Sequence, residues 1–434
     1  MRGSLSKRFN RFSLNSENSA APIETVHITY GGEQSGEPQT LEGVISTITQ
    51  DSLLVRTADG AVYQLQLSSL TVDSEAASIR TGQRAEISYH GTLPVQTASG
   101  IPSTEVRARE LLRTMGLEEK VGQMFFVRCP ADNPLPDIAA YHPGGYILFA
   151  NFFENRTKDE AYHQLKACQD ASRIPLLTGV DEEGGTVNRV SKFRQYRAVP
   201  FWSPQDLFKE GGLSSASDCE DKAQLLRAVG VNINFAPVCD VSTNAADYMF
   251  KRSIGQNAVK TSKYVETVVS ATQENGVGCV LKHFPGYGSN GDTHTGIVHD
   301  SRSLESFRQS DFLPFEAGIR AGAGAILVSH NIVECLDADV PASLSPAVHK
   351  LLRENFAFTG VILTDDLSMK AITAYRTALA PRQNHSGRQR HAALHRLCQS
   401  DPGCLAAVQR RLVHCRIEES VMRILLWKLE LGII

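Results

Sequence analysis

The 434-residue sequence predicts an α/β protein, a (β/α)8 TIM-type barrel preceded by a small all-β domain. Between residues 26 and 89, apolar and polar side chains alternate and turn residues interrupt the runs, which is typical of short strands. From residue 104 onward, near-continuous apolar runs alternate with polar segments of helical length, which indicates a parallel sheet covered by helices. No G-x-G-x-x-G motif follows any of these runs, and this disfavours a dinucleotide-binding sheet.

Composition excludes several classes of protein. Apolar residues make up 42% of the chain and charged residues 21%, which is ordinary for a globular protein. The net charge of −3 predicts no nucleic-acid partner, and no apolar run reaches the roughly 20 residues of a membrane span. The nine cysteines form no C-x-x-C pair, so we expect no metal site, no disulfide framework and a reducing compartment.

The first segment, residues 1–24, is polar and rich in Ser, Asn and Arg, and we expect it to be a disordered leader. It is basic but lacks the apolar stretch of a secretory signal. As written, the sequence therefore predicts a cytoplasmic protein. If this leader is the remnant of a truncated export signal, we expect an exported protein instead.

The small all-β domain is expected at 25–95. Its strand-like runs are HITY, GVISTIT, SLLVRT, AVYQLQL and RAEISYHG, and the pair Asp59-Gly60 predicts a hairpin between two of them. The stretch GTLPVQTASGIPS has the composition of a linker. The barrel is then expected to span 104–434.

Seven barrel strands are expected from the apolar runs KVGQMFFVR, GGYILFA, IPLLTGVD, VNINFAPV, VGCVLKHF, GAILVSH and GVILTDD. Several run directly into ionisable residues, namely Asp181, Asp240, Lys282-His283, His330 and Asp365-Asp366. A single acid at a strand end often caps the next helix instead. Several strands that end this way together predict an active site at the carboxyl edge of the barrel.

The segment LKHFPGYGSNGDTHTGIVHD, residues 281–300, places Asp292 two residues before His294. A carboxylate at this spacing can accept a hydrogen bond from the imidazole and orient it for proton transfer near neutral pH. The alternative interpretation is a polar surface loop with an incidental D-x-H.

The segment VILTDDLSMKAI, residues 361–372, ends a strand in Asp365 and Asp366. A carboxylate at a barrel rim can attack a sugar C1 and form a covalent intermediate. Asp366 is better suited to capping the following turn or to orienting its neighbour.

Two further segments supply polar groups suited to a carbohydrate. DEEGGTVNRV carries Asp181, two adjacent glycines and Arg189, and FKRSIG carries Arg252. Carboxylates and guanidinium groups bind sugar hydroxyls, and the arginines could also serve an anionic group on the substrate.

These motifs resemble those of glycoside hydrolase family 3, in particular its single-barrel bacterial β-N-acetylglucosaminidases (β-N-acetylhexosaminidases) of the peptidoglycan-recycling type. The patterns D-x-E-G-G-x-V-x-R, K-H-F-P-G-x-G with D-x-H, P-A-x-L-S-P and T-D-D-L-S-M occur in the family's order, at 181–189, 282–294, 341–346 and 364–369. One departure is Tyr287, where many members have histidine. The all-β domain lies outside the core pattern.

The resemblance implies Asp365 as nucleophile and the Asp292–His294 pair as acid/base. It implies sugar-binding roles for Asp181, Arg189, Arg252, Lys282 and His283. The implied reaction releases terminal, non-reducing β-linked N-acetylglucosamine from cell-wall fragments with retention of configuration, without a cofactor or metal.

Three alternatives stay open. The chain could be a related family 3 β-glucosidase, although in those enzymes the acid/base comes from an additional α/β domain. It could be a catalytically impaired sugar-binding barrel. Taken alone, Lys282 at a strand end could also be a Schiff-base lysine of an aldolase-like enzyme.

The stretch 376–416 is atypical, with many Arg and His, no Lys, and Asp401 as its single acid. A helix and an eighth strand are expected here, and neither pattern is visible. We hypothesise two compensating reading-frame shifts around codons 376–416; the alternative is a basic loop that binds an acidic partner. After it, IEESVMRILLWKLELGII predicts an amphipathic helix.

Overall fold

The computed structural model describes the strands between residues 26 and 96 and residues 103–210, 213–379 and 414–434. The expected leader and most of the atypical stretch, residues 380–413, lie outside the described residues. The chain divides into two compact units, Met1–Ser103 and Thr104–Ile434. Each is described by itself.

The first unit is a seven-stranded sheet, as the alternating pattern predicted. Its strands are β1 (Val26–Tyr30), β2 (Pro38–Ile48), β3 (Ser52–Arg56), β4 (Val62–Gln66), β5 (Leu70–Val72), β6 (Arg84–His90) and β7 (Val95–Gln96). They lie in the order β5-β1-β6-β2-β3-β4-β7, and only β1 and β6 pair in parallel. Alternate residues such as Leu53, Val55 and Leu65 form a buried apolar core. The expected Asp59-Gly60 turn falls outside the described residues, but β3 and β4 on either side of it pair antiparallel.

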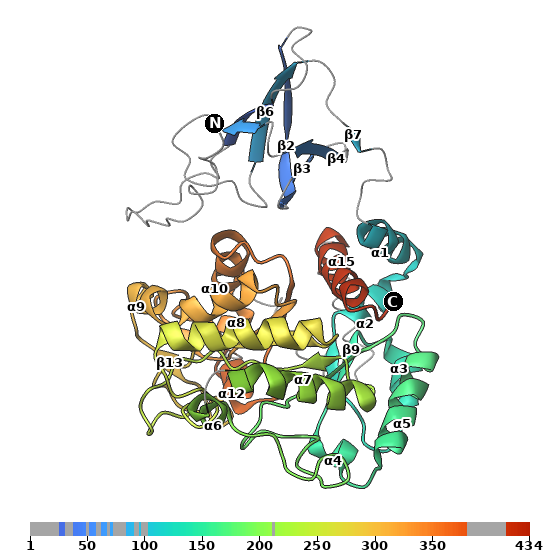
Figure 1. Ribbon diagram of the computed structural model, residues 1–434, viewed down its shortest axis with the longest axis vertical. Coiled ribbons are helices and arrows are strands. Elements are labelled where there is room, and N and C mark those ends of the chain that lie inside the picture. The colour runs from blue at the N-terminus through green and yellow to red at the C-terminus, as the bar shows by residue number, and fades with distance from the viewer. Residues whose placement is uncertain are drawn as a thin grey trace. The chain divides into compact units, whose positions relative to one another are not determined.

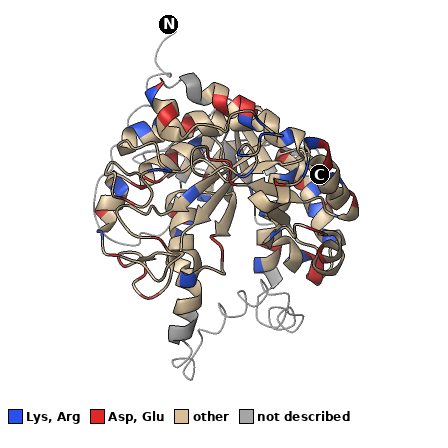
Figure 2. Ribbon diagram, turned by 90° about the horizontal axis from the view of Figure 1, so that it is seen from below, with Lys and Arg blue, Asp and Glu red and all other residues tan. Residues whose placement is uncertain are grey.

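The second unit is built on a parallel sheet of seven strands. They are β8 (Phe126–Arg128), β9 (Gly145–Leu148), β10 (Leu177–Val180), β11 (Ile233–Asn234), β12 (Gly278–Phe284), β14 (Ala325–Val328) and β16 (Val361–Thr364). Each pairs in parallel with the next, so that their spatial order follows the chain. Figure 2 shows the strands at the centre with helices around them, the arrangement of a TIM-type barrel. All seven predicted barrel strands are confirmed.

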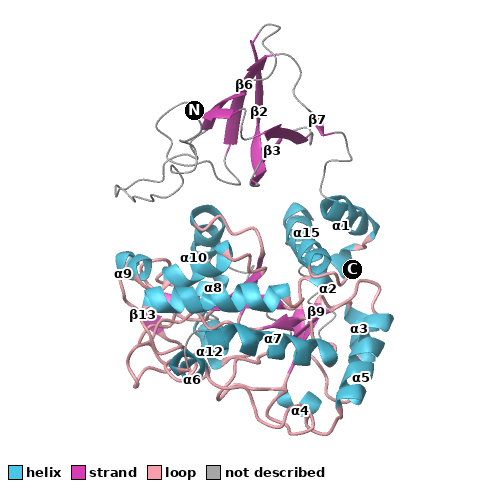
Figure 3. Ribbon diagram, in the orientation of Figure 1, coloured by secondary structure: helices cyan, strands magenta, loops and turns pink. Residues whose placement is uncertain are grey.

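Helices separate the strands, as the polar segments predicted (Figures 1 and 3). They are α1 (Ser103–Thr114), α2 (Leu117–Gln123), α3 (Leu135–Tyr141), α4 (Ala150–Phe153), α5 (Lys158–Ala171), α6 (Pro204–Lys209), α7 (Leu213–Ala228), α8 (Ala258–Glu274), α9 (Leu304–Gln309), α10 (Phe312–Arg320), α11 (Pro346–Lys350), α12 (Lys370–Leu379) and α15 (His414–Glu430). Short elements complete the unit: β13 (His299–Asp300) pairs with β15 (Ile332–Val333), and η3 (Ala342–Leu344) and η4 (Leu351–Asn355) flank α11. No helix among the described residues is long and apolar enough to cross a bilayer.

The predicted C-terminal amphipathic helix is α15, and it closes one end of the barrel. Its Ile424 and Trp427 share an apolar cluster with barrel residues such as Val280. A Cβ at Gly324, just before β14, would lie 2.0 Å from the indole nitrogen of Trp427, so only glycine allows this close packing. Another face of α15 packs against α1 and α2. Since these contacts lie at the amino ends of the strands, α15 leaves the carboxyl ends open for a site.

Candidate active site

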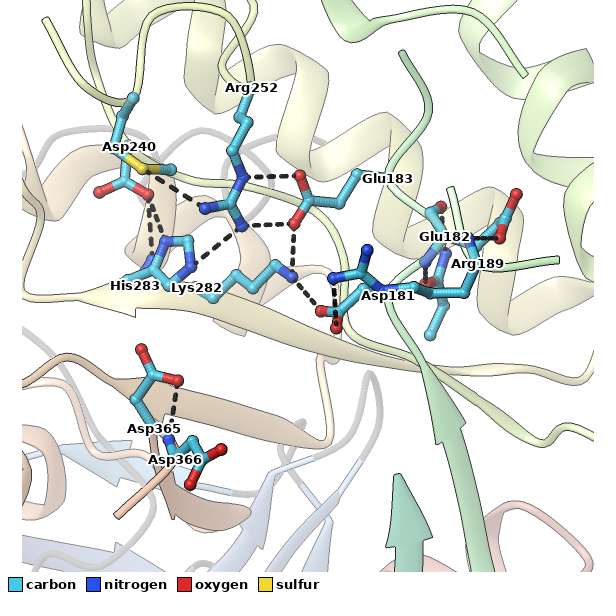
Figure 4. A network of polar contacts seen from close by, with 12 residues as sticks. Asp181, Glu182, Glu183, Arg189, Asp240, Arg252, Lys282, His283, Asp365 and Asp366 are labelled. Atoms are coloured by element: carbon cyan, nitrogen blue, oxygen red, sulfur yellow. Dashed lines mark hydrogen bonds and ion pairs between the residues drawn. The ribbon is translucent and has the colours of Figure 1, made fainter. Parts of the chain in front are cut away.

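The ionisable residues singled out at the ends of barrel strands gather at the carboxyl edge of the sheet. Asp181 directly follows β10, Lys282 and His283 lie near the end of β12, and Asp365 directly follows β16. Because all these strands are parallel, their carboxyl ends meet at one side of the barrel. Figure 4 shows the resulting network.

Lys282 lies at the centre of a buried ion-pair network. Its Nζ lies 2.6 Å from Asp181 Oδ1 and 2.6 Å from Glu183 Oε1, and only 2% of its side chain is exposed. Glu183 also accepts from Arg252, from Nε at 3.0 Å and from Nη2 at 2.6 Å. Burial alone would raise the pKa of Glu183, but Lys282 and Arg252 outweigh it and hold that pKa well below its usual range. The amine of Lys282 is held in ion pairs, which disfavours its use as a Schiff-base nucleophile.

His283 is fixed by contacts at both ring nitrogens. Its Nδ1 lies 2.8 Å from Asp240 Oδ2, and its Nε2 lies 3.3 Å from Arg252 Nη2. A guanidinium group can only donate, so Nε2 accepts and Nδ1–H donates to Asp240. Asp240 also accepts the backbone N–H of His283 at 3.2 Å and that of Tyr287 at 2.8 Å. Asp240 is therefore a positioning residue for the imidazole.

The loop after β10 is stabilised by hydrogen bonds to a buried carboxylate, that of Glu182. Glu182 accepts the backbone N–H groups of Arg189 and Val190, both at 2.8 Å, and that of Ser191 at 3.1 Å. From α7, Lys222 donates to the Glu183 carbonyl at 3.3 Å. These contacts fix the direction in which the Asp181 and Glu183 carboxylates point.

Asp365 is a half-buried carboxylate beside two histidines. Its Oδ1 accepts the backbone N–H of Asp366 at 2.8 Å. Burial raises the pKa of Asp365, but His330 and His283 outweigh it and the net direction is down. The side chain of Asp366 instead accepts the backbone N–H of Ser368 at 2.8 Å, in the turn before α12. This agrees with the capping role expected for Asp366.

Asp292 and His294 form the hydrogen bond that their spacing predicted. Asp292 Oδ1 accepts the backbone N–H of His294 at 2.8 Å and lies 2.6 Å from its Nδ1. Burial raises the pKa of Asp292, but these His294 contacts outweigh it and lower that pKa. The His294 side chain is 61% exposed, so its Nε2 is accessible to a ligand.

The loop that carries this pair is tied to the Asp365 segment. The carbonyl of Thr293 accepts the backbone N–H of Ala371 at 3.2 Å, in the first turn of α12. The Thr293 hydroxyl lies 2.6 Å from the Tyr287 hydroxyl. Tyr287, the departure from the family pattern, is thus part of what holds the loop in place.

The structure joins the predicted sugar-binding residues in one network. Lys282 bridges to Asp181, Arg252 contacts His283, and Arg189 Nη2 lies 3.8 Å from Asp181 Oδ2. Sequence reasoning did not single out Glu183, which shares Lys282 with Asp181 in the structure. Within the described residues, no group of three or more His, Cys, Asp and Glu side chains could hold a metal ion.

Comparisons with known proteins agree on one family. Residues 116–388 match the glycosyl hydrolase family 3 N terminal domain. A β-hexosaminidase of Xanthomonas campestris pv. campestris (strain B100) is 34% identical over 239 residues, which cover 52% of this chain and 69% of the relative.

Two solved structures have the same fold. A β-N-acetylhexosaminidase from Beutenbergia cavernae DSM 12333 superposes with a TM-score of 0.59 at 26% identity, over 72% of this chain and 98% of that one. A glycosyl hydrolase of the GH3 family from Mycobacterium smegmatis str. MC2 155 superposes with a TM-score of 0.62 at 27% identity, over 72% and 97%.

Proposed function

The chain belongs to glycosyl hydrolase family 3 and is a glycoside hydrolase, and on that premise we propose that it releases terminal, non-reducing β-linked N-acetylglucosamine with retention of configuration. The name β-hexosaminidase, shared by curated relatives at 33–34% identity, supports this substrate. The proposed natural substrates are fragments of peptidoglycan. No cofactor enters the proposed reaction.

One observation carries the proposal. The hydrogen bond from Ala371 N–H to the Thr293 carbonyl holds the loop of His294 against the segment that begins with Asp365. A carboxylate and an imidazole that is itself paired with Asp292 can therefore act on one glycosidic bond.

In the first step, an Asp365 oxygen attacks C1 of the sugar. The low pKa of Asp365 keeps it ionised for this attack. His294 donates the proton on Nε2 to the leaving oxygen as the bond to C1 breaks, and Nδ1 stays hydrogen-bonded to Asp292. The products are a covalent glycosyl-aspartate and the released alcohol.

In the second step, His294 Nε2 takes a proton from water, whose oxygen attacks C1. The bond to Asp365 breaks, and the carboxylate is restored. Two displacements at C1 retain the β configuration. Asp292 stabilises the imidazolium form of His294 before the first step and after the second.

The sugar ring is held by the network around Lys282 in this proposal. Asp181, Arg189, Arg252, Lys282 and His283 face the ring hydroxyls, and charge-assisted hydrogen bonds to them fix its orientation. Glu183 and Asp240 act through these residues rather than on the sugar.

Release of 4-nitrophenol from its β-N-acetylglucosaminide tests the nucleophile. We expect turnover by the parent chain and a loss of at least about 1,000-fold in Asp365→Asn. Asp366→Asn is the matched control, because it alters the neighbouring carboxylate, and it should keep activity within about tenfold of the parent. Equal losses in both variants would contradict the assignment. Faster turnover of the β-glucoside would favour the β-glucosidase alternative.

The role of His294 is tested by varying the leaving group. Because 4-nitrophenolate leaves without much protonation, His294→Ala should lower kcat/KM, which reports the first step, far less on this substrate than on an alkyl β-N-acetylglucosaminide. The expected loss on the alkyl substrate is about 100-fold or more. Equal losses on both substrates argue against general acid catalysis. A well-folded parent that binds N-acetylglucosamine without turnover would instead favour the sugar-binding alternative.

A further inference from the structure

Two arginines flank one aromatic ring at the edge of the site. Arg128 is the last residue of β8, Phe149 directly follows β9, and Arg189 lies in the loop after β10. The guanidinium carbon of Arg128 lies 4.0 Å from the centroid of the Phe149 ring, and that of Arg189 lies 5.7 Å from it. Three neighbouring strands thus bring two positive charges to one half-buried ring at the carboxyl edge of the barrel.

Both guanidinium groups retain unused hydrogen-bond donors. Arg128 is exposed, and among the described residues no carboxylate forms an ion pair with it. Among the residues that the structure describes, Asp181 is the single carboxylate in ion-pair distance of Arg189, at 3.8 Å, and Lys282 already holds Asp181 at 2.6 Å (Figure 4). Within the described part of the chain, the buried Nε of Arg189 has no acceptor. A guanidinium group with unmatched donors can gain charge-assisted hydrogen bonds from the oxygens of a ligand.

The arginines border the proposed sugar site. Arg189 Nη2 lies 3.8 Å from Asp181 Oδ2, and Asp181 faces the ring hydroxyls in the proposed function. Because C1 lies at Asp365 in the proposed reaction, the substituents that can reach Asp181 and its neighbour Arg189 are the free ones, such as those on C4 and C6.

We propose that Arg128 and Arg189, which both lie over the ring of Phe149, bind an anionic substituent on the terminal sugar. Sulfate, phosphate and carboxylate groups share the required chemistry, because each presents oxygens that match the N–H groups of a guanidinium fork. Phe149 holds Arg128 in place by a cation–π contact, which leaves its N–H edge available. This inference rests on the proposed function, since it places C1 at Asp365.

The kinetic test compares 4-nitrophenyl β-N-acetylglucosaminide with its 4-sulfate and 6-sulfate. We expect the parent to favour one of the sulfated substrates about tenfold or more in kcat/KM, and Arg128→Ala to lower that ratio about tenfold. Arg128→Lys keeps the charge but loses the planar fork, and it should retain part of the preference. Arg113→Ala, an exposed arginine on α1, is the matched control and should leave the ratio unchanged.

A binding measurement separates this inference from the catalytic proposal. With Asp365→Asn, calorimetry should show at least tenfold tighter binding of sulfated than of unsulfated N-acetylglucosamine, and Arg128→Ala in that background should abolish the difference. Turnover without any preference for either sulfate would overturn the anion site and leave the hydrolase proposal standing. If the parent binds the sulfated sugar more tightly but shows no turnover, the anion site stands and the hydrolase proposal is contradicted.

Discussion

At the scale of single residues, Glu183 illustrates how the site controls charge. It is buried with Lys282 and Arg252, and an unpaired charge in such a position is strongly destabilising. The carboxylate therefore serves two purposes. It neutralises two cations that the proposed sugar site needs, and it holds them at fixed distances from Asp181 and His283.

Glu183→Gln should lower the free energy of unfolding by about 3–5 kcal/mol, because it leaves two buried cations facing a neutral amide. The pKa of Glu183 is depressed below its ordinary value of 4.5. Its stabilising contribution is therefore present above pH 4.5 and is lost as the pH falls below that value. Urea titrations between pH 3 and 7 should show a steeper acid decline in the parent than in the variant.

Glu305→Gln provides the control for this series, because Glu305 is an exposed glutamate on α9 whose side chain is 63% exposed. It should change the free energy of unfolding by less than about 0.5 kcal/mol. If Glu183→Gln behaves like this control, the buried network contributes little to stability.

Much of the residue-scale site could be predicted, because strand-end acids and bases in a parallel barrel converge. Asp181, Lys282 and Asp365 followed from that rule alone. Glu183 could not be predicted from that rule, because its partner Lys282 lies almost 100 positions away and no local pattern indicates such an ion pair. The contact between the Tyr287 and Thr293 hydroxyls could not be predicted either, since it depends on how the loop after β12 folds back.

At the scale of elements, the turn after β10 decides where the carboxylates point. Gly184 has φ +102°, a conformation that L side chains rarely adopt, and a Cβ there would lie 2.0 Å from the Trp202 carbonyl oxygen. The segment 182–191 thus needs glycine for two independent reasons.

Gly184→Ala should lower both stability and activity. The strained φ and the backbone clash should each cost more than about 1 kcal/mol, and displacement of Glu183 should reduce kcat/KM. Gly116→Ala is the control, because Gly116 has φ −67° and a Cβ there meets nothing within 4 Å. Thermal melts and 4-nitrophenol release on both variants measure the two effects, and a Gly184 variant that matches its control would contradict the strain argument.

Element prediction succeeded where the apolar runs were long and failed for short pieces. All seven barrel strands appear as parallel runs. The two-residue pair β13–β15 and the segments η3 and η4 carry no periodicity of their own. They are fixed by tertiary hydrogen bonds, such as the one from Ala342 N–H to the Asn331 carbonyl.

At the scale of the whole molecule, the two units have separate apolar cores. Calorimetry should therefore show two transitions rather than one. N-acetylglucosamine should raise the midpoint of the transition that belongs to residues 104–434, because a ligand stabilises only the unit that binds it. Asp181→Ala should abolish that shift, and a single transition moved as a whole would show that the units unfold together.

The barrel class could be predicted from the order of strands and helices, and the comparisons agree with it. The position of the eighth strand could not be predicted, because the atypical stretch carries no strand pattern. Among the described residues the sheet ends at β8 and β16. The reading-frame hypothesis for 376–416 stays a prediction, and resequencing the coding DNA checks it.

Helix α15 has a consequence for how the protein is made. Lys120 pairs with Glu418 at 2.7 Å, and Lys428 donates to Gln123 at 2.7 Å across 305 positions of sequence. During translation, α1 and α2 emerge from the ribosome long before their partner exists. Until α15 is synthesised, the apolar face of α2 and the amino end of the barrel stay uncovered. These apolar surfaces therefore stay without their native partner for most of the synthesis of the chain.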